Sequence, residues 1–231
     1  MTQSTTPWHR RALSWLWRKG VRSWYRQVDF VIVCRDLELP EFHVPEGRRP
    51  PTEDNGPFMY PAREEHLPAL DAAFPEEKTM HFRRCMADPR IEFLVRVDSQ
   101  QVVWAHVMHG LESVPDLVYG FQVPMKKGRD AYVFDGWVHP EHRGWMVALV
   151  AANCYHGVRF DQGFRRAYAT LRVADVRSRR LHWRLKYAEV GAVRHLRIGP
   201  FKFNKVSFQP GMHPTSDPEG PVPEVGPKPS M

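Results

Sequence analysis

The order of apolar and polar positions predicts alternating strands and helices through the middle of the chain. Short runs rich in β-branched and aromatic residues indicate strands, and apolar residues recurring every three to four positions indicate helices. We expect strands at Asp29–Cys34, Phe58–Tyr60, Ile91–Val97, Val102–His109, Leu117–Gln122, Ala131–Val138, Ala167–Val173, Glu189–Ile198 and Phe201–Phe208. We expect helices at Arg63–Phe74, Glu76–Ala87, Glu141–Gly157 and Val176–Leu185. This order predicts an α+β fold, in which helices pack on the faces of a mixed sheet.

The two ends of the chain have a different pattern. Residues Trp8 to Gln27 read as a basic amphipathic helix, with Leu13, Trp17 and Trp24 roughly on one side. Prolines mark the stretch from Pro40 to Pro57 as a linker and the segment from Pro210 as a disordered tail. We therefore divide the chain into an arm with a short strand and linker (1–56), one main domain (57–208) and a Pro-rich tail (209–231).

Composition limits the class of protein. A chain of 231 residues with 42% hydrophobic residues has room for one sizeable core. It contains no apolar run long enough to span a membrane, and basic residues occupy the place of a signal peptide. Cys34, Cys85 and Cys154 are scattered, which fits neither a disulfide framework nor a zinc site. We expect a soluble cytoplasmic protein.

The net charge of +7 belongs mostly to the arm, because six basic residues and no acidic residue precede Asp29. Such an arm can lie on an anionic membrane surface through residues 8–27, which would place the protein peripherally at a membrane. Docking of its Trp-rich side on the domain, or on a second copy in a homodimer, is the alternative. The basic residues lack the distributed, aromatic-interleaved pattern of a nucleic-acid groove, so no nucleic-acid partner is expected.

The segment from Asp135 to Ala148 carries the strongest chemical signal. A strand runs through a Pro-containing turn into a helix start with Arg143 and Gly144. The unpaired N–H groups of a helix start, together with the helix dipole, form an anion site suited to a pyrophosphate. This run resembles the acyl-CoA signature of the GNAT superfamily, a strand ending in Val-x-Pro followed by Arg-x-x-Gly-x-Gly or Ala. Arg143 fits the first position and Ala148 the last, whereas Met146 replaces the middle Gly.

A second run, Val173 to Gly191, is similar to the family's second signature, Asn-x-x-Ser-x-x-Leu-Tyr-x-x-x-Gly-Phe. Ser178 and Leu181 match this pattern. Asp175 takes the Asn position, His182 the Tyr position, and Lys186-Tyr187 the place of Gly-Phe. The resemblance covers Ala131 to Gly191 by motif and Phe58 to Asp130 only by element order.

The resemblance implies a GNAT-like, mostly antiparallel twisted sheet and an N-acyltransferase activity. The acyl donor would be acetyl-CoA or another acyl-CoA, and the acceptor a small-molecule amine. It further implies that the Val138 N–H holds the thioester carbonyl oxygen. The residues it assigns to the cofactor are Val138, Arg143, Gly144, Trp145, Met146, Val147, Ala148, Asp175 and Ser178.

Two residues are candidates for proton transfer. His182 stands where the family places its acid Tyr, and an imidazole titrates near neutral pH. Asp135, beside the expected acyl group, is the candidate base, acting directly or through a water. Each also has an ordinary structural interpretation, as a helix-surface histidine and as a hydrogen-bonded carboxylate. His139 and His142 flank Glu141 without the spacing of a zinc-binding helix, so no metal is expected.

The departures from the family pattern support a rival interpretation. Met146, Asp175, His182 and Lys186 all differ from the two signatures. A catalytically silent GNAT-fold protein that serves as a binding or scaffold module, either free or on a membrane surface, is therefore the alternative to an enzyme. A membrane-associated acyltransferase that acts on lipid or polysaccharide amines is a third interpretation, based on the Trp- and Arg-rich arm. Binding of an acyl-CoA, which an enzyme requires, separates an enzyme from the silent protein.

Overall fold

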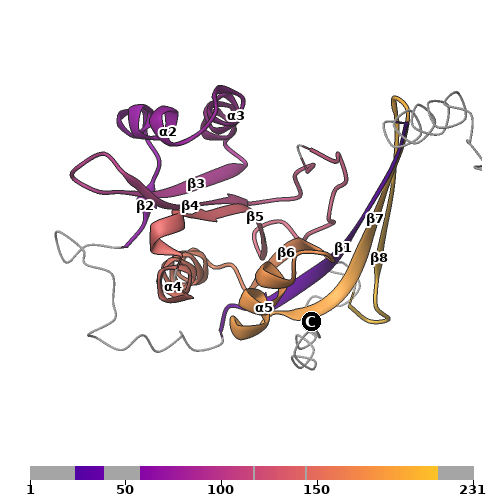
Figure 1. Cartoon of the computed structure of the whole chain (residues 1–231). Helices are drawn as coiled ribbons and strands as arrows, with labels where there is room; N and C mark the ends of the chain where they lie inside the picture. The colour runs from indigo at the N-terminus through magenta and orange to yellow at the C-terminus, as the bar shows by residue number, and fades with distance from the viewer. Residues whose placement is uncertain (1–23, 39–57, 117, 144, 213–231) are drawn as a thin grey trace, which may run out of the picture.

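The computed structural model describes residues 24–38, 58–116, 118–143 and 145–212, apart from the side chains of residues 145 and 146. These residues form one eight-stranded sheet in the order β2-β3-β4-β5-β6-β1-β7-β8 (Figure 1). Neighbouring strands are antiparallel except β5 and β6, which run parallel. The expected α+β class with a mixed, mostly antiparallel sheet is therefore confirmed.

The strands are β1 (Tyr25–Asp36), β2 (Tyr60–Pro61), β3 (Ile91–Val97), β4 (Val103–Gly110), β5 (Asp130–Val138), β6 (Arg166–Arg172), β7 (Ala188–Ile198) and β8 (Phe201–Phe208). The α-helices of the described chain are α2 (Leu67–Ala73), α3 (Glu76–Ala87), α4 (Trp145–Asp161) and α5 (Val176–Arg184). Two short 3-10 turns, η2 (Glu64–His66) and η3 (Pro140–His142), precede α2 and α4.

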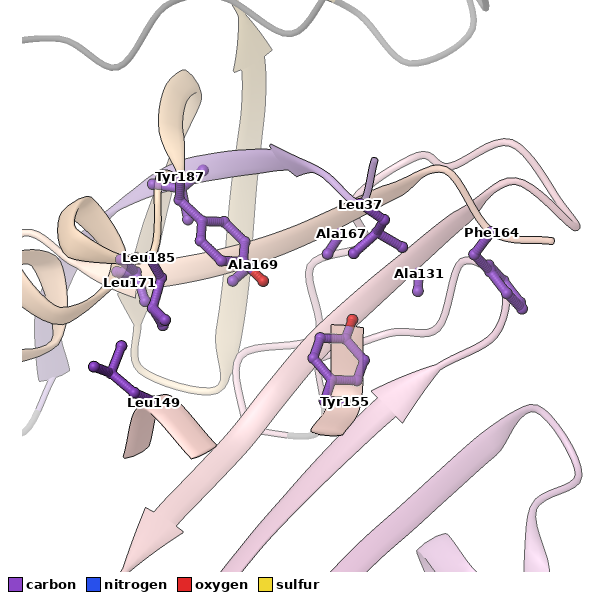
Figure 2. Packing of buried hydrophobic residues seen from close by; sticks show 11 residues of the cluster. Leu37, Ala131, Leu149, Tyr155, Phe164, Ala167, Ala169, Leu171, Leu185 and Tyr187 are labelled. Atoms are coloured by element: carbon purple, nitrogen blue, oxygen red, sulfur yellow. The ribbon is translucent and has the colours of Figure 1, made fainter. Parts of the chain in front are cut away.

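Helices cover both faces of the sheet (Figure 1). On one face, α2 and α3 bury Leu70 and Phe82 against β3 and β4. On the other face, α4 and α5 cover β5, β6 and β1. Figure 2 shows Leu149 and Tyr155 of α4 within the same buried cluster as Leu171 and Tyr187. Burial of apolar side chains in these two layers supplies most of the stabilisation of such a sheet.

The position of β1 differs from the expectation that residues 1–56 lie outside the main domain. β1 pairs with β6 along Phe30 to Asp36 and with β7 along Tyr25 to Cys34. Ile32 is completely buried at its centre. Residues 25–36 are therefore an interior strand of the sheet, and Tyr25 to Gln27 are extended rather than helical. The rest of the expected arm, the linker and most of the tail lie outside the described residues.

Three other expectations need correction. Leu117–Gln122 is not a strand in its described part; Val118 and Tyr119 donate to the Asp116 side chain in a turn, and only an isolated bridge joins Pro115 to Gln122. The helix expected from Arg63 is divided into η2 and α2, with Pro68 in the first turn of α2. The helix expected from Glu141 starts instead at Trp145, after η3.

No helix in the described part of the chain has both the length and the apolar character needed to cross a membrane.

Candidate active site

The parallel strands β5 and β6 separate at their carboxyl ends. Their ladder runs from Asp130, paired with Arg166, to Val133, paired with Ala169. Beyond this point β5 continues to Val138 and β6 to Arg172 without pairing to each other. Backbone groups on the facing edges of the two strands therefore have no partner across this opening. The carboxyl ends of parallel strands are a common position for ligands in sheets of this kind.

The backbone of Val138 faces this opening. The next residue, His139, donates its N–H to the Trp104 carbonyl of the adjacent strand β4 at 2.8 Å. Consecutive residues of an antiparallel strand point their N–H and C=O groups to opposite edges. The Val138 N–H is thus directed away from β4 and toward the opening. The Val138 carbonyl accepts a hydrogen bond from Arg143 Nε at 3.2 Å, which ties the turn to the end of β5.

The start of α4 lies directly after this turn. The 17-residue helix α4 begins at Trp145, and its first turn contains no acidic residue. The first N–H groups of such a helix are unpaired and, with the helix dipole, favour an anion. Val147 is buried in a cluster with Phe58 and Met59, which fixes the helix start against β3 and β4. A helix start of this kind suits an anion such as a pyrophosphate; Gly144 and the side chains of Trp145 and Met146 lie outside the described residues.

Asp175 and Ser178 build the start of α5. The Asp175 side chain accepts a hydrogen bond from the Ser178 N–H at 3.0 Å, which makes Asp175 the N-cap of the helix. The Ser178 carbonyl lies 2.9 Å from Nδ1 of His182. The structure thus gives both motif residues a local role in forming α5, whether or not they contact a cofactor.

His182 is half-buried, with its ring against Tyr187 at 5.0 Å between centroids. Burial lowers the pKa of His182, against the opposing effect of the Ser178 carbonyl. A proton on Nδ1 is required for donation to that carbonyl, so Nε2 of the neutral ring is an acceptor. As a proton donor, His182 would first have to gain a second proton.

Asp135 lies in a β-bulge. The ladder between β4 and β5 shifts between His106 and Met108, opposite Asp135 and Gly136, and Asp135 has a φ of 52°. The bulge places Asp135 on the same face as Phe134, toward α3, although regular alternation would direct it toward α4.

Three basic side chains surround the Asp135 carboxylate. Lys78 of α3 forms an ion pair with it, His81 Nε2 lies 3.6 Å away, and His106 Nε2 of β4 lies 3.7 Å away. Burial opposes ionisation of Asp135, but His106, His81 and Lys78 outweigh it and hold the pKa of this carboxyl well below its usual range. Burial likewise lowers the pKa of His106, whose side chain is fully enclosed. Asp135 is therefore ionised at neutral pH, with Lys78 as its ion-pair partner.

The structure does not bring the two predicted catalytic residues together. The described contacts of Asp135 are with α3 and β4, and those of His182 are with α5 and Tyr187. Sequence reasoning missed Lys78, His81 and His106. His106 within the apolar run of β4 was the one available signal. Lys78 and His81 belong to a mostly polar helix, and their contact with Asp135 could not be predicted from sequence spacing.

A second group of buried polar side chains lies on the α4 face. Arg159 of α4 forms an ion pair with Glu92 of β3, and His109 Nδ1 lies 4.0 Å from the same carboxylate. His156 Nε2 and the Tyr187 hydroxyl are 3.0 Å apart. These contacts join α4 to the sheet. Among the described residues, no group of His, Cys, Asp and Glu is arranged to hold a metal ion.

Comparison with known proteins gives matches by structure alone. No family model matches the sequence, and no curated protein matches it. A conserved protein of unknown function from Staphylococcus epidermidis ATCC 12228 has a TM-score of 0.50 at 11% identity, over 82% of this chain and 67% of that chain.

Two further structures carry the GNAT description. One, from Novosphingobium aromaticivorans DSM 12444, is assigned to the acetyltransferases of the GNAT family; its TM-score is 0.48 at 15% identity, over 75% of this chain and 65% of that chain. The other is a tandem GNAT protein from the clavulanic acid biosynthesis pathway, with a TM-score of 0.47 at 12% identity, over 84% of this chain and 58% of that chain. Identities this low concern the fold and not the chemistry.

Proposed function

We propose that this protein is an N-acyltransferase that moves an acetyl or other acyl group from coenzyme A to a small-molecule amine. One observation carries the proposal: the Val138 N–H points into the opening between β5 and β6, beside the start of α4. An N–H donor for a developing oxyanion and a helix start for a pyrophosphate thus lie at one end of one opening. The first would stabilise the charge that develops in acyl transfer from coenzyme A, and the second would bind the cofactor.

In this proposal the acyl-CoA supplies an activated thioester, and the segment from Arg143 to Ala148 binds its pyrophosphate. Asp175 and Ser178 set the direction of α5 on the far side of the opening. The Val138 N–H donates to the thioester oxygen as negative charge develops there. The amine nitrogen forms a bond to the carbonyl carbon, the carbon–sulfur bond breaks, and the sulfur leaves as a thiolate that takes up a proton.

The α3 side of β5 is our proposed position for the acceptor. An ionised carboxylate with a lowered pKa is a weak base but binds cations well, so Asp135 would orient an amine rather than deprotonate it directly. His81, half-buried at 3.6 Å from Asp135, is the group we assign to accept the proton of the attacking amine. Lys78 now occupies the position on the carboxylate that an ammonium group of the acceptor would compete for.

His182 is the residue that we assign to donate a proton to the leaving thiolate, and this role predicts a pH dependence. Its pKa is lowered and its Nδ1 faces the Ser178 carbonyl, so the charged ring is present only at acidic pH. Transfer rates that depend on His182 should therefore fall as pH rises through neutrality. A rate that is independent of pH in this range, or unchanged in His182→Phe, would exclude the role.

Calorimetric titration with acetyl-CoA and longer acyl-CoAs tests the proposal. We expect micromolar binding, and tighter binding by Met146→Gly, which restores the family's Gly beside the pyrophosphate. Substitution of Ala148 by Asp would add an acid to the first turn of α4 and should weaken binding about tenfold.

The second candidate is a catalytically silent binding module. The pairing of Asp135 with Lys78 favours it, because the carboxylate is already neutralised within the protein. If neither the wild type nor Met146→Gly binds any acyl-CoA, the protein is a silent binding module, and the catalytic roles proposed for its residues are excluded.

A further inference from the structure

The far end of the β1–β7–β8 ribbon carries an uncovered apolar surface. In the sheet register Tyr25 lies beside Ile198, and Ile198 beside Phe201. Phe203 follows in the next row on the same face. Phe201 is 66% exposed, Phe203 55%, Tyr25 50% and Ile198 43%. In Figure 1 this end of the ribbon lies away from α4 and α5.

The turn between β7 and β8 brings Trp24 into the same surface. Gly199 donates its N–H to the Trp24 carbonyl at 2.6 Å. A Cβ at Gly199 would stand 3.3 Å from the Trp24 ring, so the indole packs against this turn. Trp24 nevertheless remains 65% exposed. We call the surface formed by Trp24, Tyr25, Ile198, Phe201 and Phe203 the ribbon tip.

Basic side chains lie on both faces of the ribbon near its tip. By the register, Arg194 and Lys205 share the face of the exposed rings, and Arg26, Arg197 and Lys202 lie on the opposite face. Residues 24–29 and 194–205 contain only one acid, Asp29. Asp29 is engaged with Arg194 at 3.4 Å. A cluster of exposed aromatic residues among basic side chains matches the interface of an anionic bilayer, where rings insert at headgroup depth and cations meet lipid phosphates.

We propose that the ribbon tip docks the protein on an anionic lipid surface. Two other occupants of this surface, a second copy of the protein and the preceding segment of this chain, are disfavoured because each carries the same positive charge as the surface itself. A second copy would bring Lys202 and Lys205 of two edge strands together. The preceding segment of this chain is itself basic, with Arg18, Lys19 and Arg22 close to Trp24 in sequence. An anionic bilayer is attracted by all of these charges at once. The inference is independent of the acyltransferase proposal.

Co-sedimentation of the full chain with vesicles tests the inference. We expect binding to vesicles of phosphatidylcholine mixed with phosphatidylglycerol, weak binding to phosphatidylcholine alone, and release by salt. The double variant Phe201→Ser/Phe203→Ser should bind at least about tenfold more weakly, because it removes two inserting rings. Lys202→Gln/Lys205→Gln should bind more weakly and with a smaller salt dependence.

Matched controls lie on α3, away from the ribbon. Met80→Ser removes a side chain that is 46% exposed, and Arg84→Gln removes an exposed charge; neither should change vesicle binding. Failure of the wild type to bind, or wild-type binding by the double phenylalanine variant, would overturn the inference. So would a dimeric wild type that the double variant makes monomeric, or a lower unfolding temperature of that variant, since either result means that protein already covers the surface.

Discussion

At the scale of single residues, Lys186 differs from the second GNAT signature at a position where its backbone conformation lowers stability. It follows α5 with a φ of 61°, a conformation that glycine adopts freely and that strains other residues. The second GNAT signature has Gly at this position. We expect Lys186→Gly to raise the free energy of unfolding by about 1 kcal/mol in a denaturant titration. Arg184→Gly, inside the same helix, should instead lower it by about 1 kcal/mol, and stabilisation by both or neither would contradict the argument.

Asp135 is the residue on which the proposed acceptor site depends. Asn has nearly the same shape and tolerates a positive φ, so Asp135→Asn should keep the bulge while removing the charge. We expect kcat/KM for acyl transfer to fall by at least about 100-fold, with acyl-CoA affinity unchanged by calorimetry. Asp71→Asn, an exposed carboxylate paired with Arg83, is the control. Equal activity of both variants would remove Asp135 from the mechanism.

His109 should make the fold sensitive to acid. It is fully buried, and burial lowers its pKa to about 3. Below an unfolded pKa of about 6.5 the unfolded chain therefore binds a proton that the folded protein excludes. Stability should fall as pH drops from that value toward 3 by about 1 kcal/mol per pH unit from this residue.

Denaturant titrations at several pH values measure this effect. The neighbouring Glu92 carboxylate is paired with Arg159, so it does not compensate a charged imidazole. His109→Phe keeps a ring against Tyr155 and should show a flatter dependence on pH. His142→Gln, a partly exposed histidine, should keep the wild-type slope, and an unchanged slope in His109→Phe would show that other groups cause the loss.

At the scale of elements, the start of α5 depends on its cap. Asp175 accepts from the Ser178 N–H in place of the Asn of the family signature. Asp175→Ala should lower the free energy of unfolding by about 1 kcal/mol, whereas Asp175→Asn should restore most of it, since both residues cap helices well. Equal losses in the two variants would mean that the carboxylate acts through its charge and not as a cap.

The bulge in β5 is the second feature at this scale. Without it, alternation would direct Asp135 toward α4 and α5, where the candidate acid His182 lies. With it, Asp135 joins Lys78 and His81 of α3. β5 thus presents the Val138 N–H to the opening beside β6 and the Asp135 carboxylate to the helix layer that contains α3. In the proposed reaction, this places the acyl donor and the amine acceptor on different sides of the strand.

At the scale of the whole molecule, β1 decides whether the sheet is continuous. It lies between β6 and β7 and is the only link between them in the described sheet. Ile32→Ala empties a fully buried position at its centre and should lower the free energy of unfolding by about 2–5 kcal/mol. Gln27→Ala, an exposed change on the same strand, should stay within about 0.5 kcal/mol. A mild effect of Ile32→Ala in thermal and denaturant unfolding would mean that β1 is dispensable.

Much of the local structure followed from the sequence. α3, β3 and β8 have the bounds that periodicity predicts, and most other elements agree to within a few residues. The two motifs also lie where the GNAT resemblance places them, at strand-to-helix junctions. Local patterns predict such features because propensity and periodicity act over neighbouring residues. Near Leu117 they failed, because the Asp116 side chain competes with strand pairing for the backbone.

Only the tertiary structure decided which distant segments meet. The sequence determined that Asp29–Cys34 is a strand, but not that it lies between β6 and β7, since pairing partners depend on packing of the whole sheet. The sequence also identified Asp135 and His182 as candidates for proton transfer, because a carboxylate and an imidazole can exchange protons. A one-residue bulge and its contacts with α3 then separated them and gave Asp135 its three basic neighbours. Residue types and short-range periodicity can be read directly from the sequence. The face of the sheet on which a side chain lies depends instead on the pairing register, which the neighbouring strands determine.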